Sequence, residues 1–196
     1  MGDIQNKYGS ILFLRHGPKA FSNRKGFEGS KQLDAPLTNN GKIQVENWSN
    51  ELINAFGLPD AIITSPYCRT RQTAEILSKT CIKCDHIPEL YIDSIIGENL
   101  SYVNPPPNKN EFYNKTLLFS PIIDNSHDEW LNRIKTYYND LYIENDKNIV
   151  IITHGLFVQR IEQLMGYSGK YPGYFEGFQM FYDGNKWDMK MRIIWK

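Results

Sequence analysis

The sequence predicts an α/β fold, a three-layer sandwich with a mostly parallel central sheet. Apolar runs too short for helices, most clearly 11–14 and 149–152, alternate with longer segments whose apolar residues recur at helical spacing. Strands that alternate with helices favour parallel pairing, because each crossover holds a helix. With 196 residues, we expect a single domain spanning 1–196.

The first half of the chain predicts three strands and two helices. The run 11–14 indicates a strand buried on both faces. Residues 38–57 begin with a threonine suited to the N-cap, repeat apolar residues at helical spacing and end in glycine. A second strand follows at 61–64 and a second helix at 67–79, and we expect a third strand near 81–87.

The second half predicts two helices, one strand and a hairpin. Helical spacing over 128–142 and 156–165 flanks a strand at 149–152, and the segments 175–182 and 189–195 around Asp-Gly indicate the hairpin.

Two long segments show no clear period and predict loops. Residues 18–36 are polar and rich in lysine and glycine, which indicates a largely solvated loop over a ligand site. Residues 89–125 contain three consecutive prolines and scattered aromatics. A segment of this length without periodicity is typical of a lid or a small insertion.

The composition excludes several classes of protein. Basic and acidic residues number 22 each, which disfavours a broad nucleic-acid-binding face. No apolar run approaches the roughly 18 residues of a membrane span, and no secretory signal follows Met1, so we expect a cytoplasmic protein. Cys81 and Cys84 lack a second ligand pair at zinc-site spacing and are expected to be reduced thiols. His86 and His127 have no motif around them and are expected to lie on the surface or in packing.

Three of the predicted strands end in polar motifs. These are Arg15-His16-Gly17, Thr64-Ser65-Pro66 leading to Arg69, and Thr153-His154-Gly155. The carboxyl ends of parallel strands share one edge of the sheet, so two arginines and two histidines should converge there.

This set of side chains suits a tetrahedral dianion such as phosphate. Guanidinium groups bind phosphate oxygens through paired, charge-assisted hydrogen bonds. Because like charges disfavour imidazolium, the neighbouring arginines should lower the pKa of His16. A neutral imidazole can attack phosphorus and form a phosphohistidine that water then cleaves. A metal site from His16 and His154 is not expected, because the arginines would repel a cation.

The motifs resemble those of the histidine phosphatase superfamily, the phosphoglycerate-mutase-like proteins. The resemblance lies in the RHG motif at 15–17, the D-x-PLT-x-x-G pattern at 34–41, the SPxxRxxQTA block at 65–74 and the THG motif at 153–155. It implies a phosphoglycerate-mutase-like fold with His16 as the phosphorylated nucleophile. It also implies that Arg15, Arg69 and His154 hold the phosphoryl group.

The chain departs from the family pattern at two points. Many members read RHGxTxxN, whereas Lys19 stands at the threonine position and Asn23 falls one residue late, although we keep Asn23 as a candidate phosphate ligand. Members commonly carry an acidic residue just after the third strand. Glu89 fits that position as general acid and Asp93 is an alternative, whereas some small members that resemble this chain have no clear acid at all.

The resemblance implies a metal-independent phosphatase that hydrolyses phosphate monoesters without a cofactor. Its expected partner is a small phosphorylated metabolite or a phosphoprotein substrate. One alternative is a phosphoglycerate mutase-type transfer, although such mutases tend to be longer and this chain ends directly after the last predicted strand. The other is a non-catalytic phosphate-binding domain, which would not need the nucleophile.

Overall fold

The computed structural model describes residues 9–20, 35–98, 115–117, 127–139, 147–182 and 187–194. Within them, seven strands form one sheet in the order β4-β3-β2-β5-β1-β6-β7. The strands are β1 (Ser10–Arg15), β2 (Ala61–Thr64), β3 (Glu89–Asp93), β4 (Lys115–Leu117), β5 (Asn148–Thr153), β6 (Gly177–Tyr182) and β7 (Trp187–Ile193). The helices are α1 (Asn39–Phe56), α2 (Cys68–Ile82), α3 (His127–Asn139), α4 (Gly155–Leu164) and the short 3-10 helix η2 (Ser94–Ile96).

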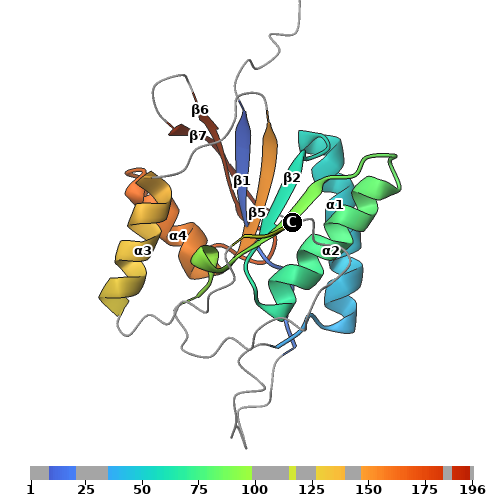
Figure 1. Cartoon of the computed structure of the whole chain (residues 1–196), viewed down its shortest axis with the longest axis horizontal. Helices are drawn as coiled ribbons and strands as arrows, with labels where there is room; N and C mark the ends of the chain where they lie inside the picture. The colour runs from blue at the N-terminus through green and yellow to red at the C-terminus, as the bar shows by residue number, and fades with distance from the viewer. Residues whose placement is uncertain are drawn as a thin grey trace, which may run out of the picture.

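The sheet is mostly parallel, as the sequence predicts. Strands β4, β3, β2, β5 and β1 pair parallel to one another, whereas β6 and β7 join antiparallel at the far side of β1. Helices α1 and α2 lie on one face of the sheet, and α3 and α4 lie on the other (Figure 1). The arrangement is therefore a three-layer α/β sandwich. No helix among the described residues is long and apolar enough to cross a membrane.

The apolar run of β1 is buried on both faces because the strand lies between β5 and β6. Leu12 and Leu14 join the core beneath α1 and α2. Ile11 and Phe13 join the second core, beneath α3 and α4. Successive side chains of a strand point to opposite faces, so a run of four apolar residues fills both cores.

Helix α1 has the capping that its sequence predicts. The Thr38 hydroxyl accepts a hydrogen bond of 2.7 Å from Gly41 N, which satisfies an N–H group of the first turn. Val45, Trp48 and Leu52 are buried one turn apart, and Gly57 ends the helix with a φ of 86°. A positive φ of this size favours glycine.

The expectation of a third strand at 81–87 is wrong. Helix α2 continues to Ile82 because Cys81 still faces the core, and a turn with Asp85 at a φ of 57° follows. The third strand is β3, in which Leu90 and Ile92 are buried.

The expected lid at 89–125 therefore begins too early. Residues 89–93 and 115–117 are strands of the central sheet. The segments 99–114 and 118–125 lie outside the described residues. That the chain is one domain with a lid stays a prediction.

Candidate active site

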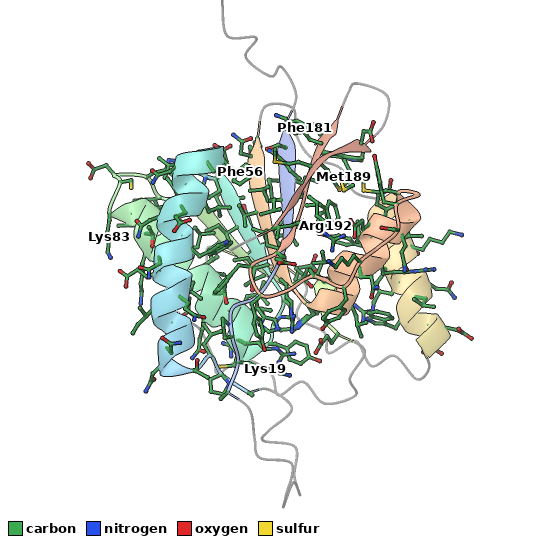
Figure 2. All side chains as sticks on the ribbon, turned by 180° about the vertical axis from the view of Figure 1, so that it is seen from behind. Lys19, Phe56, Lys83, Phe181, Met189 and Arg192 are labelled. Carbon is green, nitrogen blue, oxygen red and sulfur yellow. The ribbon has the colours of Figure 1, made fainter. Side chains whose placement is uncertain are left out.

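The polar motifs meet at the carboxyl edge of the parallel strands. Arg15 at the end of β1 pairs with Thr153 at the end of β5, and Thr64 at the end of β2 pairs with Ile152. His16 therefore follows β1 where His154 follows β5, and its backbone N donates to Thr153 O at 3.0 Å. Figure 2 shows Lys19 at this end of the molecule, opposite to Phe56 at the far end of α1.

Arg69, in the first turn of α2, links the groups of this site. Its side chain is fully buried, with Nε donating to His16 Nε2 at 3.1 Å. Its Nη2 lies 3.2 Å from His154 Nδ1 and 2.6 Å from Glu98 Oε2. The guanidinium carbon lies 4.6 Å from the centre of the Tyr67 ring. One arginine thus contacts both predicted histidines and a carboxylate.

The hydrogen-bond partners of His16 define its tautomer. Nδ1 lies 2.6 Å from the carbonyl oxygen of Gly17, which can only accept, so Nδ1 carries the proton. Arg69 can only donate, so Nε2 keeps its lone pair. Burial, and then the positive charge of Arg69, holds the pKa of His16 well below its ordinary value of 6.5. The imidazole is therefore neutral at pH 7, with a nucleophilic nitrogen facing Arg69.

His154 is neutral for the same reasons but has the opposite tautomer. Nδ1 accepts from Arg69, so the proton is on Nε2, which donates to the Ser65 hydroxyl at 2.8 Å. Complete burial, followed by the charge of Arg69, lowers its pKa well below 6.5. The two imidazole rings lie 5.5 Å apart, edge to face.

Glycines allow the two histidine motifs to approach their neighbours. A Cβ at Gly17 would lie 2.7 Å from Val45 Cγ2 and 2.9 Å from Phe175 Cε1. A Cβ at Gly155 would lie 2.5 Å from the Tyr171 ring. Any larger residue at either position would have to displace these neighbours.

Arg15 lies at the same edge, in partial contact with solvent. Its Nη1 donates to Pro172 O at 2.9 Å, and its guanidinium carbon lies 4.2 Å from the centre of the Tyr174 ring. The buried Nε has no hydrogen-bond partner among the described residues. An unpaired buried donor is costly unless a ligand or water satisfies it.

Among the described residues, Glu98 supplies a carboxylate to this site, and no sequence motif had indicated it. In addition to its ion pair with Arg69, its Oε2 lies 3.7 Å from His154 Nδ1. Family members were expected to carry an acidic residue just after the third strand. Once β3 is placed at Glu89–Asp93, Glu98 lies five residues beyond that strand. A strand assignment based on buried Leu90 and Ile92 could have identified it.

Helix η2 holds the backbone before Glu98 against the sheet. Asp93 ends β3 and accepts from Ile95 N at 2.8 Å, and the Thr153 hydroxyl donates to Ile96 O at 2.5 Å. Asp93 thus has a structural partner, and burial raises its pKa. The described contacts of Asp93 include neither histidine.

The structure corrects the placement of Glu89. Glu89 is the first residue of β3, is exposed, and pairs with Ala61 at the amino end of β2. Its backbone N donates to Asp60 O at 2.9 Å. Because β3 runs parallel to β2 and begins at Glu89, this residue lies at the sheet edge opposite to His16. The expected strand at 81–87 would have placed Glu89 after the strand, which is why the sequence pattern indicated this residue as the acid.

Three further residues named in the sequence analysis are Asn23, His86 and His127. Asn23 lies outside the described residues, as does the side chain of His127. His86 lies 2.8 Å from Pro59 O, near the amino end of β2.

Lys19 is a further cation of the site. Burial, and then the nearby positive charges of Arg69 and Arg15, lower its pKa, whereas Glu98 opposes the shift. Its charge in turn contributes to the lowered pKa of both histidines. Its backbone forms an isolated antiparallel bridge with Leu37. In the sequence, only its position two residues after the Arg-His-Gly motif indicated that Lys19 could lie near the site.

The fold and site define an α/β protein whose sheet edge carries positive charge beside two neutral imidazoles. Among the described residues, no group of three or more His, Cys, Asp or Glu side chains could hold a metal ion. The family model of the histidine phosphatase superfamily (branch 1) matches residues 11–176. The chain belongs to this superfamily.

Solved structures share the fold at low sequence identity. The ecdysone phosphate phosphatase of Bombix mori has a TM-score of 0.65 at 15% identity, covering 93% of this chain and 92% of that one. A putative alpha-ribazole-5'-P phosphatase of Escherichia coli has a TM-score of 0.64 at 16% identity, covering 94% and 96%. The phosphoserine phosphatase of Entamoeba histolytica has a TM-score of 0.62 at 16% identity, also covering 94% and 96%. A comparison with curated proteins gives no match.

Proposed function

We propose that the protein is a metal-independent phosphatase that hydrolyses phosphate monoesters through a phosphohistidine at His16. The observation that carries this proposal is the position of Arg69, which contacts the lone pair of His16, the ring of His154 and the carboxylate of Glu98. A nucleophile, a cationic clamp and a proton donor are thereby held together.

The phosphoryl group would be bound by the positive side chains of this edge. Arg69 supplies a buried guanidinium, Lys19 an ammonium, and Arg15 a buried Nε with no described partner. The negative charge of a phosphoryl group in transfer is spread over three equatorial oxygens, which fixed donors stabilise. His154 belongs to this set through Arg69, because its Nδ1 accepts from the Nη2 of that guanidinium while its Nε2–H group donates to Ser65.

In the first step, an oxygen of the bound phosphoryl group takes over the Nε–H group of Arg69 that His16 accepts in the free protein. The released Nε2 lone pair then attacks phosphorus, and the bond from phosphorus to the ester oxygen breaks. The bound phosphoryl dianion competes with Glu98 for Arg69, so the Glu98 carboxylate takes up a proton from solvent in this complex and gives it to the ester oxygen as the alcohol leaves. The Nδ1–H group of His16 donates to Gly17 O at 2.6 Å. This hydrogen bond stabilises the positive charge that the ring acquires on phosphorylation.

In the second step, water attacks phosphorus and the bond to Nε2 breaks. Glu98 takes one proton from the attacking water, which restores the carboxyl group of the substrate complex. His16 returns to its neutral form with the proton still on Nδ1. The burial and positive neighbours that lower its pKa favour this neutral state.

The names of similar structures support a phosphorylated substrate. The Bombix mori protein is an ecdysone phosphate phosphatase and was solved with tungstate, and the Entamoeba histolytica protein is a phosphoserine phosphatase. At identities of 15% and 16%, we extend to this chain only the proposal of a small phosphorylated metabolite or a phosphoprotein as substrate.

The test is incubation with a chromogenic aryl phosphate and separately with phosphoglycerates, measuring free phosphate and isomerised product. The proposal expects free phosphate. Isomerised phosphoglycerate without release would indicate a mutase. Binding of phosphate without turnover of any ester would indicate a non-catalytic domain.

A further inference from the structure

The segment between α4 and β6 places two tyrosine rings beside Arg15. The guanidinium carbon lies 4.2 Å from the centre of the Tyr174 ring and 5.1 Å from that of Tyr171. The Tyr174 ring is also 5.8 Å from the His16 ring. An aromatic surface therefore adjoins the proposed nucleophile and one of its phosphate ligands.

Hydrogen bonds along its length hold this segment in place. Arg192 on β7 donates to Lys170 O, and Arg15 donates to Pro172 O at 2.9 Å. Gly173 N donates to the Glu176 carboxylate at 2.7 Å. Because folding already orders these groups, a ligand that binds the rings does not have to order them.

The outer ring of this surface is accessible. Tyr171 is 47% exposed, and Leu156 in the first turn of α4 is equally exposed. Tyr174 is half-buried and packs against the core beneath α1 and α2. Tyr174 thus supports Arg15 from the protein side, whereas Tyr171 offers a ring to an incoming molecule.

We propose that Tyr171 and Tyr174 form a subsite for an aromatic leaving group, so that the preferred substrates are phosphate monoesters of alcohols that carry an aromatic ring close to the ester oxygen. This inference rests on the proposed function, because the phosphoryl group must first occupy the site at Arg15 and His16. A ring attached near the ester oxygen then stacks on Tyr171, and such stacking adds to the favourable burial of apolar area.

The experiment compares benzyl phosphate with propyl phosphate. Both leaving groups are poor alkoxides of similar basicity, so the ratio of their kcat/KM values reports contact with the ring rather than chemical reactivity. The wild type should favour benzyl phosphate by roughly 3–10-fold, on the scale of an aromatic pair. Tyr171→Ala should reduce this ratio toward one, and Tyr171→Phe should keep it.

Tyr167 provides a matched control. It is 39% exposed, and its hydroxyl donates to Asp188 at 3.0 Å. Asp188 pairs with Phe181, which in turn pairs with Ser10 at the amino end of β1. Tyr167 therefore contacts the edge opposite to the site, and Tyr167→Ala should keep the benzyl preference.

Binding of non-hydrolysable phosphonates separates this inference from the proposed function. Benzylphosphonate should bind more tightly than propylphosphonate in calorimetry, and Tyr171→Ala should abolish the difference, even if no ester were turned over. Turnover with equal kcat/KM for both esters would overturn the subsite but not the phosphatase. An equal loss on both esters in Tyr171→Ala would show that the ring only positions Arg15, and would also overturn the subsite.

Discussion

Arg69 and Glu98 form an ion pair of 2.6 Å between α2 and the segment that follows η2, with the arginine side chain 1% exposed and the glutamate 22% exposed. Truncating one partner of a buried pair leaves the other charge uncompensated. Removing the Glu98 carboxylate would therefore disturb Arg69 as well as remove the group that we propose as proton donor. Conservative amide variants are needed to separate the two roles.

Glu98→Gln should reduce hydrolysis of alkyl phosphates by roughly 10²–10⁴-fold, the usual scale of general-acid catalysis. The variant should hydrolyse nitrophenyl phosphate at a rate much closer to that of the wild type, because nitrophenolate leaves without protonation. Steady-state kinetics on both substrates measure the difference. Glu89→Gln is the matched control at the opposite sheet edge and should alter neither. A leaving-group-dependent loss in Glu89→Gln or Asp93→Asn would refute the assignment.

Lys19 should contribute to substrate binding in its charged form. Burial and the neighbouring arginines lower its pKa, so its charge is lost at a lower pH than the ordinary value of 10.5. For the wild type, KM should therefore rise as the pH increases toward that value. In Lys19→Arg this rise should disappear, because arginine keeps its charge. Identical alkaline profiles for the two proteins would count against a role for Lys19.

Stability should fall in mild acid because His16 and His154 are buried in their neutral forms. Both pKa values are lowered from 6.5, so below that pH the unfolded chain binds protons that the folded protein excludes. The free energy of unfolding should drop by up to about 1.4 kcal/mol per pH unit for each histidine. Urea titrations between pH 6.5 and 5.5 measure the slope. His16→Gln should halve it, and an unchanged slope would contradict the account.

Activity should not depend on a divalent metal. The described part of the chain supplies positive charge at the site through Arg15, Lys19 and Arg69, so treatment with EDTA is expected to leave phosphate release unchanged. Loss of activity in EDTA, with recovery on adding magnesium or zinc, would contradict this prediction.

The convergence of Arg15, His16, Arg69 and His154 could be predicted from sequence because each follows a strand whose apolar run is unmistakable. Parallel pairing then carries the ends of β1, β2 and β5 to one edge. Strong local patterns and a simple topological rule were sufficient here.

The residue that we propose as proton donor could not be predicted, because its identification depends on where one short strand begins. Cys81 is buried in helix α2, but a residue of a central strand at this position would be buried as well. Its apolar character therefore did not distinguish a helix from a strand. Placing the strand early moved the acidic residue from Glu98 to Glu89. The sequence did not indicate the tyrosines near Arg15 either. Tyr171 and Tyr174 lie in the connection between α4 and β6, and no sequence motif places that connection beside Arg15.

The most direct test of the central claim is to trap the intermediate by quenching the wild type in denaturant during turnover of a labelled phosphate monoester. Acid-labile, base-stable label should be found on a peptide containing His16 in the wild type and be absent from His16→Ala, with circular dichroism confirming that the variant is folded. Equal labelling of both proteins, or rapid phosphate release by His16→Ala, would contradict phosphoryl transfer through His16.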